Sequence, residues 1–179
     1  PRQAPGARAR TIPHCLDERA GEHPYRIFLK ERAGGNGEWM SMTYGEAKIA
    51  TDALAQAFLD MGAGPDAPVM ILSGNSITSA MVILAAQKMG APAAPISVAY
   101  SLMSTDFEKL KHCFNAVKPK VIFAEVLEPF MPALAALDTS DVTIITRIGS
   151  GEDVSDYAGL LQTAPPPAVG DAMARLDDD

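Results

Sequence analysis

The chain is poor in cysteine and has no long apolar run, and each shortage excludes a class of protein. Its two cysteines, Cys15 and Cys113, are too few for the disulfide framework of a small secreted domain. Reduced thiols in a cytoplasmic protein are therefore expected. The basic start, PRQAPGARAR, lacks the apolar core of a secretory signal. The longest apolar helix expected, Ile77 to Met89, is too short to span a bilayer.

Basic residues are also in the minority. The 179 residues carry 15 Lys and Arg against 22 Asp and Glu, which gives a formal net charge of −7. Nucleic acids and anionic membrane surfaces both bind basic faces, so neither is expected as a partner. A hydrophobic content of 47% with mixed charge is typical of a globular chain that can bury a core.

Common chemical motifs are missing as well. The sequence has no G-x-G-x-x-G and no G-x-x-x-x-G-K-[ST], the two usual phosphate cradles, and no G-x-S-x-G nucleophile elbow. The dipeptides His14-Cys15 and His112-Cys113 could suggest a metal site. Adjacent helical residues diverge by about 100°, so one pair can hardly ligate one ion. Zinc sites usually show other spacings, and we predict no metal site and assign no catalytic residue.

One stretch, Pro68 to Ile96, organises the rest of the chain. Val69–Leu72 is a continuous apolar run of the kind found in strands buried on both faces. A helix is expected over Ile77–Met89, capped by Asn75 or Ser76 and ended by Gly90. Ala93–Ile96 then returns to the sheet. A strand, a helix and a strand with short links predict a parallel pair with a right-handed crossover.

The remaining elements follow from period, caps and breakers. A capping box at Thr43 and Glu46 predicts a helix running to Met61, and Ser104 is expected to cap another, with Phe107, Leu110 and Phe114 on its apolar stripe. The other expected elements are a helix at Thr11–Ala20 with Ile12, Cys15 and Leu16 on one side, a hairpin of Tyr25–Lys30 and Trp39–Met42 around Gly34–Gly37, strands at Val121–Ala124 and Val142–Thr146, and helices over Leu127–Leu137 and Ser155–Leu161.

This order of elements predicts the fold class. We expect an α/β fold with a mostly parallel sheet, helices on both faces and a β-hairpin near the N-terminus, at one edge of the sheet. Residues 1–10 are expected to be a disordered tail, residues 11–162 one α/β subdomain, and residues 163–179 a Pro/Asp-rich linker.

Ligands of such sheets bind beyond the carboxyl ends of the strands. Those ends are expected to carry Ser73-Gly74-Asn75, the loop Ser97–Ser101, and Glu125. Asn75, Ser97, Tyr100 and Ser101 are the candidate substrate-binding residues near the cleft. Two plainer interpretations remain open: a turn with a helix cap at Ser73–Ser76, and packing of the Tyr100 ring against its own loop.

Three stretches resemble one known family. They are Met42-Thr43-Tyr44-Gly45-Glu46; Gly74-Asn75-Ser76 followed by Ala85–Ala91; and Ser97–Ser101 followed by the strand Lys118–Ala124. In order and spacing they are similar to the N-terminal part of the AMP-forming acyl- and aryl-CoA synthetases. One segment is most similar to the feruloyl-CoA synthetase branch: residues Ser97 to Glu125, SVAYSLMSTDFEKLKHCFNAVKPKVIFAE.

The resemblance implies a function and also shows that several of the family's motifs are missing from this sequence. Such ligases join a carboxylic acid, here a small aromatic one, to CoA through an acyl-adenylate, using ATP, Mg²⁺ and coenzyme A. Their Ser/Thr/Gly-rich phosphate loop, other ATP motifs and catalytic lysine have no counterpart here. The chain is therefore expected to be an N-terminal fragment that is inactive alone, with 163–179 leading toward the missing loop.

Two further expectations concern an alternative function and self-association. An alternative to the ligase fragment is a stand-alone flavodoxin-like binding module without catalysis. If the chain is a fragment, apolar surface around Ile77–Met89 and the hairpin edge favour self-association. The net charge of −7 opposes this association, but salt screens charge beyond about 8–10 Å.

Overall fold

The computed structural model describes residues 11–32 and 37–162. The expected tail at 1–10, the linker at 163–179 and the hairpin residues Gly34–Asn36 lie outside the described residues. Within the described part of the chain, no helix has the length and apolar content needed to cross a membrane.

The chain alternates helices and strands as the sequence predicts. In order, the elements are α1 (Ile12–Glu22), β1 (Ile27–Arg32), β2 (Trp39–Thr43), α2 (Tyr44–Asp60), β3 (Val69–Leu72), α3 (Ile77–Lys88), β4 (Ala93–Pro95), α4 (Ala99–Leu102), α5 (Glu108–Val117), β5 (Val121–Val126), α6 (Leu127–Leu134), β6 (Thr143–Ile148), β7 (Val154–Asp156) and α7 (Tyr157–Leu160).

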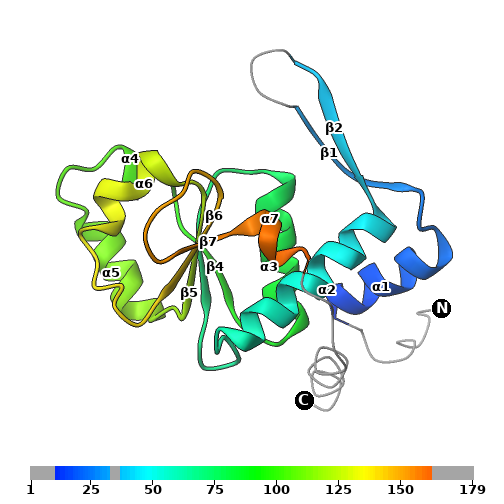
Figure 1. The fold of residues 1–179 in the computed structure, drawn as a ribbon, viewed down its shortest axis with the longest axis horizontal. Coiled ribbons are helices and arrows are strands. Elements are labelled where there is room, and N and C mark those ends of the chain that lie inside the picture. Colours follow the sequence, from blue (N-terminus) through cyan, green and yellow to red (C-terminus); the bar gives the residue numbers. More distant parts are fainter. Residues whose placement is uncertain (1–10, 33–36, 163–179) are drawn as a thin grey trace, which may run out of the picture.

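Five strands form one parallel sheet in the order β4-β3-β5-β6-β7. Helices lie on both sides of it (Figure 1), which confirms the predicted α/β class. The hairpin β1–β2 is antiparallel, as expected, but it forms a sheet of its own. Its expected place at the edge of the main sheet was therefore wrong. The hairpin packs on α2 and α3 through Phe28, Leu29 and Met42, which contact the core of that side.

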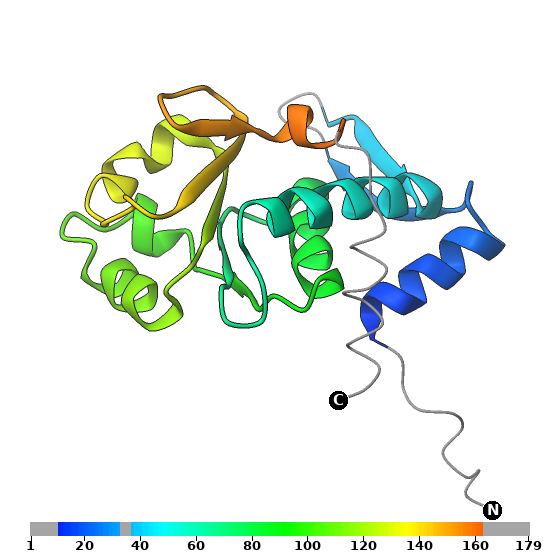
Figure 2. The same ribbon diagram turned by 60° about the horizontal axis from the view of Figure 1, so that its bottom comes forward.

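Alternation along the strands builds two separate cores. Val69, Ile71 and Phe123 point to one face of the sheet, which α2, α3 and α7 cover, with α1 packed on α2 and α3; we call it the α2 face. Met70 and Ile122 point to the other, the α5 face, which α4, α5 and α6 cover. Figure 2 shows the two groups of helices on opposite sides of the sheet. A strand buried on both faces needs an unbroken apolar run, which is why these strands were readable in the sequence.

Helices α2 and α3 begin at the predicted caps. The Thr43 hydroxyl accepts the Glu46 N–H, and the Glu46 carboxylate accepts the N–H and the hydroxyl of Thr43. These bonds, first that from the Thr43 backbone, lower the pKa of Glu46. For α3 the structure selects Ser76 over Asn75, because Ser76 Oγ accepts the Ser79 N–H at 3.0 Å. Gly90 ends α3 in the left-handed conformation, at φ 81°.

The expected face of α1 was wrong. Leu16 is buried, but its companions are Pro13 and Ala20, whereas Ile12 is 63% exposed and Cys15 is exposed. The helix period alone does not say which stripe docks. The stripe that docks against α2 and α3 also carries Asp17 to a partner on α3.

That partner is a lysine inside the fold. Lys88, near the end of α3, is 1% exposed, and its Nζ lies 2.7 Å from Asp17 Oδ1 on α1. It also pairs with Asp52 on α2, which Lys48 contacts on its other oxygen at 2.5 Å. Burial lowers the pKa of Lys48, but the hydrogen bond to Asp52 and the charges of Asp52 and Asp17 raise it overall. The four side chains tie three helices together.

The α5 face differs from the sequence prediction in two places. Residues 97–101, expected to be a loop, include the helical turn α4, which packs on α6. On α5, Leu110 is completely buried, whereas Phe107 and Phe114 are only partly buried against it. The α5 start follows the prediction in part: Ser104 Oγ accepts the Phe107 N–H, and Asp106 accepts the Glu108 N–H.

The C-terminal part contains a strand that the sequence did not predict. Val154–Asp156 pairs with β6 as β7, so the expected helix at Ser155–Leu161 begins only at Tyr157. The strand has three residues, too few to show an apolar period. The expected strand at Tyr25–Lys30 is displaced as well, and Tyr25 is 91% exposed.

Candidate functional site

The chain changes direction within the sheet between β3 and β5. From β3 it crosses through α3 to β4 on one side, and from β5 it crosses through α6 to β6 on the other. Such a switch point leaves a crevice outside the carboxyl ends of the two strands, where ligands of open α/β sheets bind. The candidate site is therefore the carboxyl edge of β3, β5 and β6.

A carboxylate joins the three strand ends at this edge. Ser73, which follows β3, donates its hydroxyl to Glu125 Oε2 at 2.9 Å. Arg147 on β6 donates from Nε to Glu125 Oε1 at 3.1 Å. The Glu125 side chain is 14% exposed and that of Arg147 is 37% exposed. The edge thus presents a fixed anion and a half-exposed cation to solvent.

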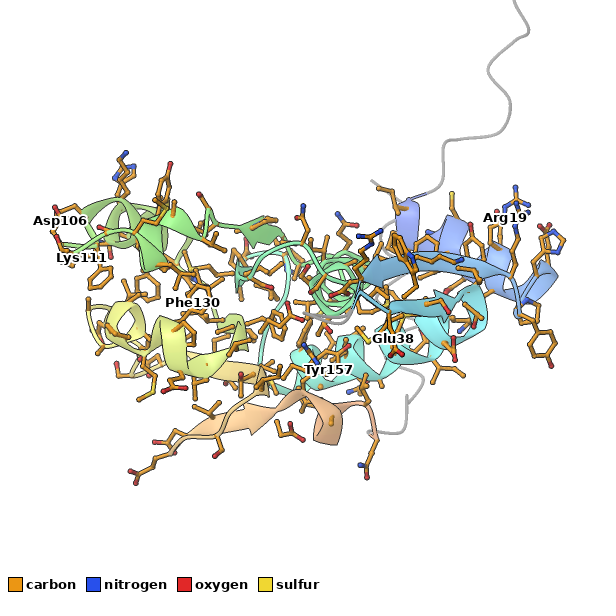
Figure 3. All side chains as sticks on the ribbon, turned by 90° about the horizontal axis from the view of Figure 1, so that it is seen from above. Arg19, Glu38, Asp106, Lys111, Phe130 and Tyr157 are labelled. Atoms are coloured by element: carbon orange, nitrogen blue, oxygen red, sulfur yellow. The ribbon has the colours of Figure 1, made fainter. Side chains whose placement is uncertain are left out.

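A buried phenol lies beside this group. Tyr157 opens α7, and its ring packs on Phe123 of β5 at 6.0 Å between centroids. Burial raises the pKa of Tyr157 to about 12, against the charge of Arg147 and with a further rise from Glu125. The side chain is therefore a neutral hydroxyl at neutral pH. Figure 3 places it midway between the two ends of the molecule that Arg19 and Asp106 mark.

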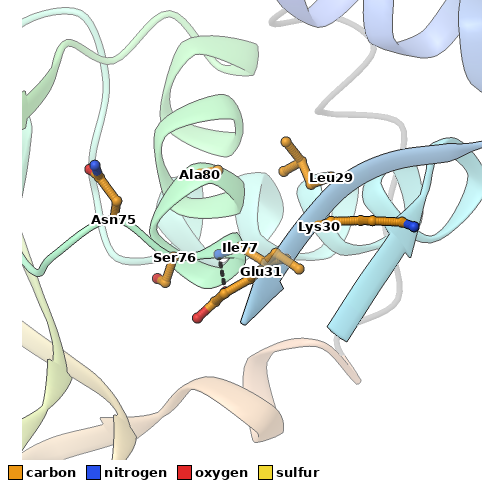
Figure 4. Close-up of a pocket in the computed structure, with 7 residues that line it drawn as sticks. All are labelled: Leu29, Lys30, Glu31, Asn75, Ser76, Ile77 and Ala80. Atoms are coloured by element: carbon orange, nitrogen blue, oxygen red, sulfur yellow. Dashed lines mark hydrogen bonds between the residues drawn. The ribbon is translucent and has the colours of Figure 1, made fainter. Parts of the chain in front are cut away.

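The hairpin closes the side of the edge that faces α3. Glu31 on β1 accepts the Ile77 N–H on Oε2 at 2.6 Å (Figure 4). A cavity of about 320 Å³ lies here, and Leu29, Asn75 and Ala80 also line it. A second cavity, of about 240 Å³, shares Glu31 and Ile77 with the first. Its other walls are Met40, Ser41, Met42, Thr78, Glu125 and Arg147.

The four candidate residues from the sequence do not meet in one cavity. Asn75 lines the 320 Å³ cavity beside the hairpin. Tyr100 lines another, of about 330 Å³, where Lys109 Nζ lies 5.5 Å from the centroid of its ring. Ser101 is buried, and among the described residues its hydroxyl has no hydrogen-bond partner. Ser97 is exposed, and its carbonyl accepts the Tyr100 N–H.

Two residues of the edge were missed by sequence reasoning. Arg147 directly follows the predicted strand Val142–Thr146, so a cation at a carboxyl end was a usable signal. Glu31 offered none, because it meets Ile77 across 46 residues of sequence.

The described residues do not supply an obvious place for Mg²⁺ or for a triphosphate. Within 11–32 and 37–162, no three His, Cys, Asp or Glu side chains come together as a metal would require. The sequence also lacks both usual phosphate cradles. We therefore derive no chemical step from this chain through either group.

The sequence matches a known family, the AMP-binding enzymes, over residues 16–178. The match includes the whole five-stranded sheet and the carboxyl edge described above. The chain belongs to the AMP-binding enzyme family.

Known relatives of this AMP-binding chain are distant. Over 90 residues it is 32% identical to CymA, a probable non-canonical nonribosomal peptide synthetase of Salinispora arenicola, and this match covers 50% of the chain and 1% of CymA. The luciferase-like enzyme of the nonluminescent mealworm Zophobas morio has the same fold, with a TM-score of 0.70 at 19% identity. A benzoate CoA ligase of Burkholderia xenovorans has it too, with a TM-score of 0.65 at 15% identity.

This AMP-binding chain is much shorter than the proteins it resembles. The superposition on the luciferase-like enzyme covers 92% of this chain but 36% of the other. For the benzoate CoA ligase the shares are 88% and 29%. At these identities the likeness establishes the α/β fold.

Proposed function

We propose that this chain is the N-terminal α/β part of an AMP-forming acid–CoA ligase. The family match over residues 16–178 carries the proposal. In the whole ligase the substrate carboxylate attacks the α-phosphorus of ATP and displaces pyrophosphate. The CoA thiol, losing its proton, then attacks the acyl carbonyl, forms the thioester and releases AMP. The whole enzyme uses Mg²⁺ with ATP, and its location is cytoplasmic.

In this proposal the chain serves the reaction by shaping a wall of the cleft. Glu125 holds Ser73 and Arg147 in fixed positions at the switch point. Arg147 is 37% exposed and offers guanidinium donors at this edge, while its charge is balanced by that of Glu125. Asn75, Ser97, Tyr100 and Ser101 stay proposed as residues near the cleft, and no catalytic residue is assigned to this chain.

We further propose a small aromatic acid of the feruloyl type as substrate. Its support is the sequence from Ser97 to Glu125, which resembles the feruloyl-CoA synthetase branch. Substrate choice depends on the difference in contacts that two acids make in one pocket. The test is therefore a comparison of acids, with ferulate and benzoate as aromatic candidates and a fatty acid as the aliphatic competitor.

The experiment measures pyrophosphate release and ATP binding. The purified chain is expected to release no pyrophosphate with ferulate and to give no heat of binding with Mg-ATP in a calorimetric titration. A longer polypeptide that continues past Asp179 into the family's phosphate loop is expected to release pyrophosphate with ferulate. Turnover by the chain alone contradicts the proposal that catalysis needs the polypeptide beyond Asp179. Turnover of the longer polypeptide with fatty acids only contradicts the aromatic substrate.

A second candidate is a stand-alone flavodoxin-like binding module. The strand order β4-β3-β5-β6-β7 favours it, because it is the doubly wound order of flavodoxin-like folds. The coding sequence after Asp179 separates the two candidates. A stop codon there favours the module, and a continuing T-S-G-x-T-G sequence favours the ligase.

Self-association of the isolated chain also stays a proposal. Trp39 and Met40 on the hairpin and Ile148 at the end of β6 are exposed apolar side chains. Light scattering after size exclusion, at low and high salt, tests it. A monomer at both salt concentrations contradicts the proposal.

A further inference from the structure

The hairpin β1–β2 is attached to the fold on one side only. It stands apart from the five-stranded sheet (Figure 1) and contacts α2 and α3. Phe28 and Leu29 pack on the core of the α2 face, and the Phe28 ring lies 4.8 Å from that of Tyr44. By contrast, Ile27 and Trp39 are 45% and 60% exposed. An element held by so few buried contacts opens locally at a lower free energy than the sheet does.

A charged hydrogen bond fixes the hairpin to the start of α3. The first turn of a helix has N–H groups without partners inside the helix. In α3 the helix's own cap satisfies Ser79, through Ser76 Oγ. The Ile77 N–H is satisfied from outside the helix, by Glu31 of the hairpin at 2.6 Å. A carboxylate at this position also faces the positive end of the 12-residue helix dipole.

The same pair of residues separates two cavities. Glu31 and Ile77 line both the cavity of about 320 Å³ and that of about 240 Å³. The first contains Asn75, and the second reaches Glu125 and Arg147 at the carboxyl edge. Figure 4 shows Glu31 reaching from β1 to the backbone at the start of α3. The contact between Glu31 and Ile77 is therefore part of the lining of both cavities.

We propose that the hairpin is a strap over the carboxyl edge and that Glu31 is its latch. With the latch closed, the strap holds the two cavities apart and covers the start of α3. With the latch open, the strap moves as a unit, the cavities join into one groove leading to Glu125 and Arg147, and the Ile77 amide meets solvent. This device follows from the fold and does not depend on the ligase function proposed above.

The test is amide hydrogen exchange, followed by NMR, on the purified chain with Glu31→Ala and Glu31→Gln. Three groups of amides are compared: those of β1 and β2 for the strap, Ile77 for the latch, and Phe123 in the buried β5 for global unfolding. In Glu31→Ala, the Ile77 and strap amides are expected to exchange roughly tenfold faster or more, because a hydrogen bond to a charged group is lost. Phe123 keeps the wild-type rate.

The milder variant and a control complete the design. Glu31→Gln keeps the length and an acceptor oxygen, so the same amides exchange faster by a smaller factor, and it gives the readout if Glu31→Ala does not fold. Glu152→Gln changes an exposed carboxylate between β6 and β7 and is expected to leave all three groups unchanged. Faster exchange at Ile77 alone overturns the strap, because the hairpin then stays closed without its latch. Equal acceleration at Phe123, or no change at Ile77, overturns it as well.

Discussion

The two faces of the sheet solve the same packing problem in different ways. The α2 face is covered by long helices, α2 of 17 residues and α3 of 12, whose buried residues include alanines beside large side chains such as Leu54, Phe58 and Met81, and it encloses the ion pairs of Lys88. The α5 face is covered by shorter helices of 4, 10 and 8 residues, anchored by large apolar side chains such as Leu110 and Phe130. Both faces bury apolar side chains, and the α2 face also encloses charge.

The difference indicates how each face fixes the positions of its helices. On the α2 face, a buried cation with carboxylates on two other helices adds directional contacts between α1, α2 and α3 to the apolar packing. Buried ion pairs can serve specificity rather than stability, and we hypothesise that role here. Large interlocking side chains fix position by shape, so the α5 face needs no such group.

The largest expected loss of stability comes from replacing the buried cation of the α2 face, Lys88. Lys88→Met keeps much of the side-chain volume but leaves Asp17 and Asp52 without their buried partner. The free energy of unfolding is expected to fall by ~3–5 kcal/mol, as when one member of a buried pair is removed. Lys48→Met, which removes a lysine that is 41% exposed, is the matched control and should cost about 1 kcal/mol or less. Urea unfolding measures both, and equal losses contradict a special role for Lys88.

The corresponding break in the α5 face is Leu110→Ala. This side chain is 0% exposed in the centre of its cluster. Its loss is expected to lower the free energy of unfolding by about 3 kcal/mol, within the range for a buried leucine. The same urea experiment measures it. A loss below about 1 kcal/mol would mean that the surrounding helices collapse into the cavity, so that shape does not fix this face.

Phe114→Ala sharpens the comparison within α5. A fully buried phenylalanine would cost ~3–5 kcal/mol, but Phe114 is only partly buried, so we expect about 2 kcal/mol or less. Lys111→Ala removes an exposed pair with Glu108 and is expected to cost about 0.5 kcal/mol or less. If Phe114→Ala costs more than Leu110→Ala, the assignment of the anchor of this face is wrong.

A smaller effect is expected only at alkaline pH and only on the α2 face. Burial raises the pKa of Tyr157 from 10.0 to about 12, so between these values the folded chain holds a proton that the unfolded chain releases. Its contribution is full below pH 10 and is lost as the pH rises toward 12. At pH 11 the free energy of unfolding is expected to be lower by about 1.4 kcal/mol than it is below pH 10. Urea unfolding of wild type and Tyr157→Phe at pH 8 and 11 isolates it, and an equal fall in both contradicts the assignment.

The buried central strands and the caps of α2 and α3 could be predicted from the sequence, whereas β7 and most of the candidate site could not. Val69–Leu72 and Val121–Ala124 are continuous apolar runs, and burial on both faces demands such runs. Thr43 and Ser76 cap helices through bonds to residues three positions away, so their signals are local. Glu125 was placed at a carboxyl end because it follows a readable strand, although its bonds to Ser73 and Arg147 were not foreseen.

The sequence by itself therefore determined the fold class, the buried central strands and the capped starts of α2 and α3, since each depends on an apolar run or on partners a few residues apart. Only the tertiary structure decided which stripe of α1 docks, that the hairpin stands apart from the sheet, and that Lys88 is buried. It also decided the contacts of Glu31 and Lys88, which join residues 46 and 71 positions apart. A charged side chain looks the same in a sequence whether it meets water or a carboxylate, and only chain packing brings the carboxylate to it.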